Sequence, residues 1–217
     1  MRWKSQPFTP AYGTPKTFTV GGRKLLAVMK TEGLAVLDAG NGATVATVDW
    51  KTSFDTTATT PIILGSKIFI STGYDRGCAL LELAGDQLKK IYEHKAMCNH
   101  MNNSVLIDGH LYGFDGTAHR GRPTEFVCLE FATGKEKWRV PPGVGLGCGS
   151  VMASADGMLL ILSERGELLA APADPREFKP TARHQVLGGR CWTVPVLANG
   201  RIYCRNARGD LVCVKVR

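Results

Sequence analysis

A pattern of apolar runs and tight turns recurs five times along the 217 residues and limits what this chain can fold into. Each copy has a small residue or a proline at its entry, an apolar run, a polar turn with glycine, and a second apolar run. The intervals between successive entries are 46, 43, 46 and 45 residues, measured at Pro15, Pro61, Ser104, Ser150 and Pro195. Such near-constant spacing indicates a repeat architecture whose units share one fold.

The residues inside each copy alternate as in β-strands. Two-residue turns that suit hairpins separate the first two apolar runs, as at Asp108-Gly109, Asp156-Gly157 and Asn199-Gly200. A third apolar run follows in each copy and a fourth in most, without a sustained helical period. The sequence therefore predicts an all-β chain, a β-propeller of about five four-stranded blades.

The repeats predict one propeller domain over residues 1–217. Its expected blades are residues 12–50, 55–94, 98–140, 146–186 and 190–217, with an additional N-terminal strand at residues 1–6. The last repeat offers three strands, so the N-terminal strand could complete it and close a five-blade ring. Alternatively, the chain is the C-terminal arc of a larger ring, and residues 1–6 end a missing blade.

One blade motif resembles a known family. Residues 131–138, FATGKEKW, are similar to the pattern ALDxxTGKxxW of the pyrroloquinoline quinone (PQQ) repeat, and residues 37–50 are a looser copy. Residues 73–83, 102–115 and 194–213 extend the likeness to bacterial PQQ-binding-like propellers, which are similar to the outer-membrane assembly lipoprotein. The resemblance implies rings of seven or eight blades that are usually exported to the periplasm. Gly134 would form the turn before the fourth strand, and Trp50 and Trp138 would fill the space between blades.

Charge and hydropathy exclude some classes of protein. No apolar stretch approaches the ~18 residues of a membrane span. The N-terminus lacks the apolar region of a signal peptide, so either the chain stays in the cytoplasm or its natural start lies elsewhere. The net charge is +8, but the basic residues are scattered, so we expect no nucleic-acid partner.

Neither a metal nor a cofactor is expected. Quinoprotein dehydrogenases resemble one another in an adjacent cysteine pair, a calcium ion on Glu, Asn and Asp side chains, and a catalytic Asp. The seven cysteines here include no adjacent pair and no CxxC motif. Two alternatives stay open: PQQ bound with calcium, and a metal or thiol site formed by His100 with Cys98, Cys148 and Cys191 in the loops between blades.

Loops between blades and loops between the second and third strands share one face of a propeller, where ligands usually lie. Arginines precede the turn glycine in three inner loops and could surround an anion. The segment Gly116–Glu125 lengthens the third inner loop and is a candidate contact for a partner. The candidate binding residues on this face are Tyr74, Arg76, His100, Asn102, Asn103, Arg165, Arg190, Trp192 and Arg208.

No complete catalytic set is found in the sequence, which favours a binding protein over an enzyme. We therefore expect a non-catalytic scaffold whose loop-rich face binds a protein partner or a small ligand. The alternative is a PQQ-dependent dehydrogenase or a degenerate relative of one.

Overall fold

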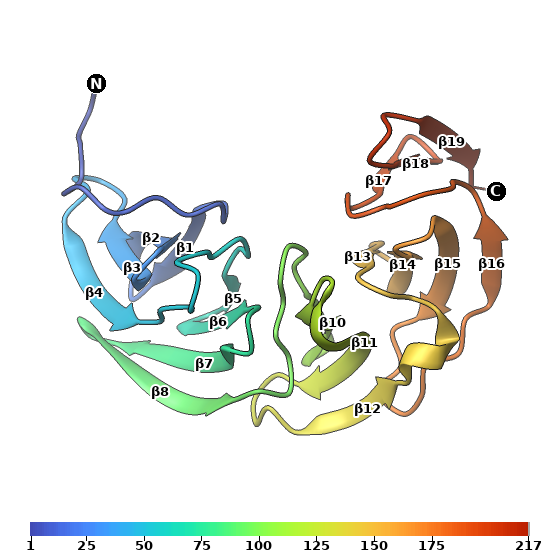
Figure 1. Cartoon of the computed structure of the whole chain (residues 1–217). Helices are drawn as coiled ribbons and strands as arrows, with labels where there is room; N and C mark the ends of the chain where they lie inside the picture. Colours follow the sequence, from blue (N-terminus) through green and yellow to red (C-terminus); the bar gives the residue numbers. More distant parts are fainter. Residues whose placement is uncertain (217) are drawn as a thin grey trace. The chain divides into compact units, whose positions relative to one another are not determined.

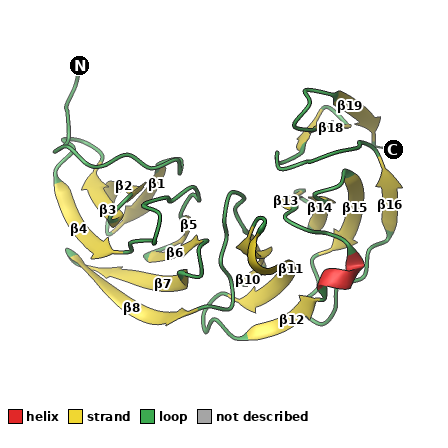
Figure 2. Cartoon of the chain, in the orientation of Figure 1, coloured by secondary structure: helices red, strands yellow, loops and turns green. Residues whose placement is uncertain are grey.

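The computed structural model describes residues 1–216, which form nineteen strands and one short 3-10 helix, η1 (Pro142–Val144) (Figures 1 and 2). No α-helix occurs in this range, and no helix in it is long and apolar enough to cross a membrane. The strands form five antiparallel sheets, four of four strands and one of three. The prediction of an all-β propeller with about five blades is confirmed, and the strands lie within the expected blade limits.

The chain divides into two compact units, and the first, Met1–His100, contains two sheets. In each sheet the strand order follows the chain order, so consecutive strands are joined as hairpins. The first sheet contains β1 (Lys16–Val20), β2 (Arg23–Lys30), β3 (Gly33–Asp38) and β4 (Thr44–Asp49). The second contains β5 (Ile62–Leu64), β6 (Lys67–Thr72), β7 (Gly77–Ala84) and β8 (Gln87–His94).

The second unit, Met101–Arg217, contains the other three sheets. The third sheet contains β9 (Val105–Ile107), β10 (His110–Thr117), β11 (Arg120–Glu130) and β12 (Glu136–Val140). The fourth contains β13 (Ser150–Ala153), β14 (Met158–Leu162), β15 (Glu167–Pro172) and β16 (Ala182–Gln185). The last contains β17 (Val196–Ala198), β18 (Arg201–Arg205) and β19 (Leu211–Lys215).

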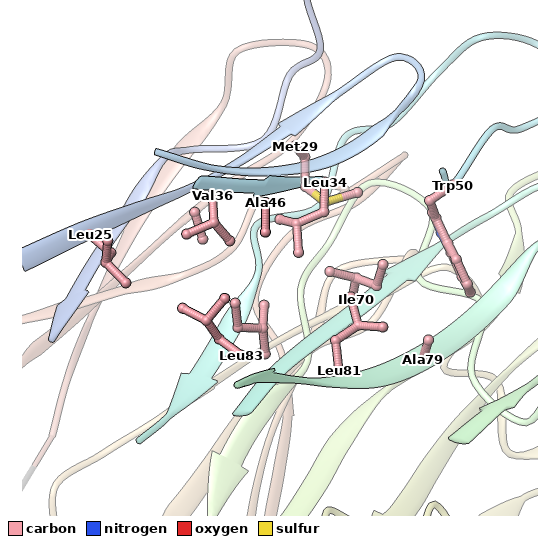
Figure 3. Packing of buried hydrophobic residues seen from close by; sticks show 12 residues of the cluster. Leu25, Met29, Leu34, Val36, Ala46, Trp50, Ile70, Ala79, Leu81 and Leu83 are labelled. Carbon is pink, nitrogen blue, oxygen red and sulfur yellow. The ribbon is translucent and has the colours of Figure 1, made fainter. Parts of the chain in front are cut away.

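The core of the first unit lies between its two sheets (Figure 3). Apolar side chains of β2 to β4, such as Leu34 and Val36, point toward those of β6 and β7, such as Ile70 and Leu81. Trp50 closes one end of this core with 1% of its surface exposed, and its indole N–H donates to the Thr72 hydroxyl at 2.9 Å. Each sheet thus buries a face against its neighbour, as expected for consecutive propeller blades.

The second unit has two such cores. Tyr112, Phe126 and Cys128 of the third sheet pack with Leu159 and Ile161 of the fourth. Trp138 packs against the first of these cores, and its indole N–H donates to the Asp174 carbonyl at 2.8 Å. The second core joins the fourth and last sheets through a set of buried residues that includes Leu160, Leu162, Leu187, Cys191, Ile202 and Cys204.

The turn of the PQQ motif has the same geometry in both of its copies. Gly134 has a φ of +73°, and its N–H donates to the Glu130 carbonyl at 2.8 Å. Gly42 has a φ of +76°, and its N–H donates to the Asp38 carbonyl, also at 2.8 Å. Left-handed φ values favour glycine because it lacks a Cβ atom, which explains why the motif requires this residue.

The N-terminal residues do not form the strand that the sequence suggested for residues 1–6. Trp3 instead packs over Gly42, and its indole N–H donates to the Ala39 carbonyl at 3.1 Å. The segment therefore lies on the turn between β3 and β4. The assignment of all repeats to one domain, and the closure of a ring, stay predictions.

Candidate functional site

Glu164 joins loops from three repeats of the second unit. It lies in the loop between β14 and β15, where its backbone N–H donates to the Leu146 carbonyl at 2.9 Å. Its backbone carbonyl accepts from the N–H of Cys191 at 2.8 Å. Leu146 and Cys191 precede the fourth and fifth repeats, so the backbone of Glu164 holds both inter-repeat loops beside one inner loop.

The Glu164 carboxylate is surrounded by nitrogen atoms. One oxygen lies 3.0 Å from His119 Nε2 and accepts from the Trp192 indole N–H at 3.1 Å. The other oxygen accepts from the backbone N–H of Cys148 at 3.1 Å. We name the group His119, Cys148, Glu164, Arg190 and Trp192 the Glu164 cluster.

Trp192 contacts two other planar groups of this cluster. The centres of the His119 and Trp192 rings are 5.3 Å apart, and the Arg190 guanidinium carbon lies 4.3 Å from the Trp192 ring. Trp192 is half-buried, whereas His119 and Arg190 are exposed. The arrangement thus presents planar surfaces suited to stacking and to cation–π contacts.

A cavity of about 280 Å³ lies next to the cluster. Its walls come from the β10–β11 hairpin, which supplies His119, Arg120 and Arg122, and from the loop that contains Cys148. The segment Gly116–Glu125 was expected to be a loop, but β10 and β11 extend through most of it. Strand β10 ends at Thr117 and β11 begins at Arg120, so His119 lies at the hairpin tip, with a φ of +56°.

A buried carboxylate anchors the hairpin. Asp115 is fully buried and lies between Arg122, at 2.7 Å, and Arg139, at 2.6 Å. Arg139 also pairs with Glu125 and Glu136, and these carboxylates outweigh the cost of burial and raise its pKa. The hairpin is therefore held by ion pairs at its base and by the His119–Glu164 contact at its tip.

A second cluster lies in the first unit. Tyr74 packs between Phe54 and His100, with ring centres 4.7 Å and 4.9 Å apart, and we name these three residues the Tyr74 cluster. Phe54 is 46% exposed, while Tyr74 and His100 are half-buried. Burial lowers the pKa of His100, so its imidazole is neutral at pH 7.

The three loop arginines have different surroundings. Arg76 lies 3.5 Å from the Trp50 ring and pairs with Glu93 at 2.7 Å, so it already has partners in the fold. Arg165 and Arg208 are exposed. Arg76 belongs to the first unit and the other two belong to the second, so the anion ring stays a prediction.

The two asparagines of the loop before the third repeat differ in burial. Asn102 is 7% exposed, and its side-chain amide donates to the Gly149 carbonyl at 2.9 Å, which joins the loops before the third and fourth repeats. Asn103 is half-buried. The Asn102 contact gives that residue a structural role, while a binding role for either asparagine stays a prediction.

The three loop cysteines are poorly suited to react as thiolates. Cys98, Cys148 and Cys191 are all buried, and burial raises the pKa of Cys148 to about 12 and also raises that of Cys191. Within residues 1–216, no three His, Cys, Asp or Glu side chains form a group that could hold a metal ion. The one carboxylate of the Glu164 cluster accepts two N–H groups and lies 3.0 Å from His119 Nε2, and the expectation that no cofactor is bound stays a prediction.

Phe54 and Glu164 are not among the residues predicted from the sequence, and His119 is included only as part of the candidate contact segment Gly116–Glu125. Phe54 and Glu164 lie in loops that the repeat pattern identifies, but nothing distinguishes them there from exposed turn residues. His119 lacks any ligand spacing along the chain. Their contacts join different repeats, which a pattern within one repeat does not reveal.

The fold is similar to solved propellers over nearly the whole chain. The quinohemoprotein alcohol dehydrogenase ADHIIG from Pseudomonas putida HK5 matches 99% of this chain and 43% of its own length, with a TM-score of 0.70 and 14% identity. The quinohemoprotein alcohol dehydrogenase from Comamonas testosteroni matches 98% of this chain and 44% of its own length, with a TM-score of 0.68 and 13% identity. BamB from Moraxella catarrhalis covers 100% of this chain and 86% of its own length, with a TM-score of 0.34 and 12% identity.

The chain spans less than half the length of both dehydrogenases. No protein-family model matches the chain, and no curated protein matches its sequence. At these identities the likeness shows the fold: the chain has the β-propeller fold of the quinohemoprotein dehydrogenases, as its repeat motif predicts.

Proposed function

We propose that this chain is a non-catalytic propeller and that the Tyr74 cluster and the Glu164 cluster each bind a small ligand or a protein segment. The observation that carries the proposal is the position of strained backbone. Of six non-glycine residues with positive φ among those described, Asp108 and Asn199 lie in Xaa-Gly turns that favour it. The other four lie in or beside the two clusters: Asp55, Tyr74, Asp75 and His119.

Backbone strain of this kind costs on the order of 1–3 kcal/mol per residue and is concentrated at functional sites in proteins. Tyrosine is a particularly costly residue for a left-handed conformation, since it lacks the short polar side chain that helps Asn and Asp. The strain in this chain therefore supports a role for the side chains that it positions.

The protonation and pairing of the buried polar groups support a binding role over a catalytic one. A raised pKa keeps the Cys148 thiol protonated, and the Asp115 carboxylate is paired with two arginines. By contrast, the aromatic rings of both clusters are partly exposed and held in place by their neighbours. Such preorganised planar groups lower the entropy cost of binding.

Comparative affinity capture tests the binding role. Immobilised wild-type chain and its Tyr74→Ala, Trp192→Ala and Tyr12→Ala variants are exposed to one cell extract, and retained molecules are identified by mass spectrometry. Tyr12 is 80% exposed and lies outside both clusters, so it is the matched control. We expect a molecule that wild type and Tyr12→Ala retain and that at least one cluster variant loses. The same retained set for all four chains would contradict the proposal.

A titration with PQQ and calcium tests the catalytic alternative. Tryptophan fluorescence reports binding, and reduction of an electron-accepting dye with simple alcohols reports turnover. We expect neither saturable quenching at micromolar quinone nor turnover by folded protein. Robust turnover would replace the scaffold with a quinoprotein dehydrogenase.

A further inference from the structure

The last sheet of the second unit has two faces of different chemistry. Its inner face carries Ile202 and Cys204, which are buried in the core shared with the fourth sheet. Successive side chains of a strand point to opposite faces, so Arg201, Tyr203 and Arg205 of β18 lie on the outer face. The register is unbroken along β18 and adds the directly opposite residues of β17 and β19 to the outer face: Val196, Ala198, Leu211, Cys213 and Lys215.

This outer face exposes apolar side chains that adjoin one another. Leu211 is 66% exposed and Val196 is 56% exposed. Tyr203 is half-buried and lies directly opposite both Val196 and Cys213. Exposed apolar groups that form a continuous patch mark interaction surfaces more often than single ones do.

Cations lie around the apolar groups of the outer face, and none of its residues is acidic. Arg201, Arg205 and Lys215 are exposed, and no acidic side chain within residues 1–216 forms an ion pair with them. Arg201 and Lys215 are also direct cross-strand partners. Like charges at such positions destabilise a sheet, and a carboxylate between them would relieve the repulsion.

The corresponding face of the fourth sheet is apolar. The two sheets have matching hairpins, in which Met158, Leu162 and Pro172 correspond to Arg201, Arg205 and Lys215. Leu162 is fully buried in the core between the fourth and last sheets. Because cations are costly to bury against apolar groups, the outer face of the last sheet suits a partner that supplies carboxylates.

The spacing of the cations indicates the form of that partner. Arg201 and Arg205 are four residues apart on one face of a strand, which separates them by about 13 Å, and Tyr203 lies between them. An extended segment repeats this spacing when acidic residues at positions i and i+4 flank an apolar residue at i+2. Such a segment matches both the charge and the apolar centre of the face.

We infer that the outer face of the last sheet binds an extended acidic segment of a partner protein, with carboxylates at Arg201 and Arg205 and an apolar side chain on Tyr203. This interaction goes beyond the proposed function, because none of these residues belongs to either cluster. A second copy of the chain fits less well, since two such faces would bring like charges together. Single-stranded nucleic acid also fits less well, because the face offers one aromatic ring where such strands stack on several.

Cys213 provides a probe of this face in the unmodified protein. It is exposed on the outer face, whereas the other cysteines are buried, so N-ethylmaleimide should alkylate it first. The ligand is the peptide Ser-Ser-Glu-Thr-Val-Thr-Glu-Ser-Ser at about 50 mM salt, where charge is weakly screened. Mass spectrometry follows alkylation, and we expect the peptide to slow it saturably by at least tenfold. Unchanged alkylation in millimolar peptide would overturn the inference.

A second peptide separates complementary spacing from net charge. Ser-Ser-Thr-Glu-Val-Glu-Thr-Ser-Ser has the same composition, but in an extended chain its glutamates point away from the face that carries valine. We expect its half-saturating concentration to be at least fivefold higher. Equal protection of Cys213 by the two peptides would overturn the proposed fit.

Charge variants test the position of the site. Arg205→Glu is expected to raise the half-saturating concentration of the first peptide at least tenfold, and Lys179→Glu to leave it unchanged. Lys179 is exposed and lies in the same unit but outside the last sheet, so it is the matched control. Equal loss in both variants would show attraction to net charge alone and overturn the site. The two peptides need no variant, so a misfolded Arg205→Glu chain would not prevent the test.

Other occupants of the face can be recognised in the same assay, and each would overturn the inference. Stronger protection of Cys213 by oligo-dT than by the acidic peptide would assign the face to nucleic acid. Dimers that sediment as such and disappear in Arg205→Glu would assign it to a second copy. Alkylation of Cys213 at least a hundredfold slower in the peptide-free protein than in a model peptide of residues 211–215 would show that the chain itself covers the face.

Discussion

At the scale of single residues, Tyr74 combines an unfavourable backbone with favourable side-chain contacts. Its φ is +57° and that of Asp75 is +58°, and the turn closes through the Arg76 N–H to the Gly73 carbonyl at 3.2 Å. A left-handed residue with a Cβ atom costs about 1–2 kcal/mol relative to the right-handed form. The tilted contact of the Tyr74 ring with Phe54 and its edge-to-face contact with His100 offset part of this cost.

Substitution of Tyr74 can separate these two terms. Ala normally stabilises a folded chain more than Gly, because Gly has more backbone freedom to lose. At a φ of +57° we expect the opposite order, with Tyr74→Gly more stable than Tyr74→Ala by about 1 kcal/mol in urea unfolding. Arg165 lies in the corresponding loop of the fourth repeat and is not among the residues with positive φ, so there Ala should be the more stable. The usual order at Tyr74 would show that its turn is unstrained.

Trp50 also combines two roles, since it fills a core and donates a buried hydrogen bond. Trp50→Phe keeps an aromatic ring but removes the donor to Thr72, whose side chain is 1% exposed. We expect a loss of about 1–3 kcal/mol in the free energy of unfolding, because the Thr72 hydroxyl loses its donor. Adding Thr72→Val should cost less in the Trp50→Phe chain than in wild type. Additive costs would mean that the hydrogen bond contributes nothing.

At the scale of elements, the fourth, outer strand of a sheet limits the space around the first residue of the third strand. Glycines at or next to this start, Gly33, Gly77 and Gly166, leave no space for a Cβ atom. A Cβ there would overlap the carbonyl oxygen of Val48, His94 or Leu187, which come from the fourth strand or the residues after it. In the last sheet, which has three strands, nothing lies within 4 Å of a Cβ on Gly209.

Gly166 and Gly209 form a matched pair for this effect. Their φ values are +87° and +92°, so alanine is strained to a similar degree at both. We expect Gly209→Ala to cost about 1–2 kcal/mol from strain alone, and Gly166→Ala to cost several kcal/mol because the backbone of Leu187 must also move. Thermal or urea unfolding measures both. Equal costs would show that the close approach of the Leu187 backbone to Gly166 is unimportant.

At the scale of the whole molecule, buried thiols make stability depend on pH. Burial raises the pKa of Cys128 and Cys148 to about 12 and that of Cys204 to about 11, from an ordinary value near 9. The unfolded chain releases these protons above pH 9, whereas the folded chain retains them. Their contribution to stability is therefore complete below pH 9 and is lost as pH rises from about 9 to 12.

The expected loss is roughly 1 kcal/mol for each of the three thiols at pH 10. Urea midpoints at pH 8 and pH 10 measure it, and Cys148→Ala should reduce the difference between them. Cys213 is exposed, so Cys213→Ser should leave the difference unchanged. Stability that does not vary over this range would mean that the thiols ionise freely in the fold.

Much of the fold could be predicted because propeller blades are local structures. Four consecutive strands with short turns pair with their chain neighbours, so spacing and alternation identify a blade without knowledge of the rest. The PQQ motif likewise predicts a left-handed glycine at Gly134 and a packed tryptophan at Trp138, as found. The predicted strand at residues 1–6 is absent, because this segment has no neighbouring strands in the sequence to pair with and Trp3 packs on a turn instead.

Less of the candidate site could be predicted, because its contacts cross between repeats. Tyr74, His100, Arg190 and Trp192 could be chosen from their loops alone. Phe54 and Glu164 could not, since each is an ordinary residue in its own loop, and His119 could be chosen only as part of the segment Gly116–Glu125.

The sequence by itself determined the repeat, the blades and the turn glycines, because these depend on residues a few positions apart. The tertiary structure decided which loops meet, which cysteines are buried and which arginines already have partners. Those outcomes depend on how one blade packs on the next, and the energy of that packing is spread over many small contacts. Glu164 illustrates the difference: it follows the serine of an exposed-looking turn in the sequence, and it joins three repeats in the fold.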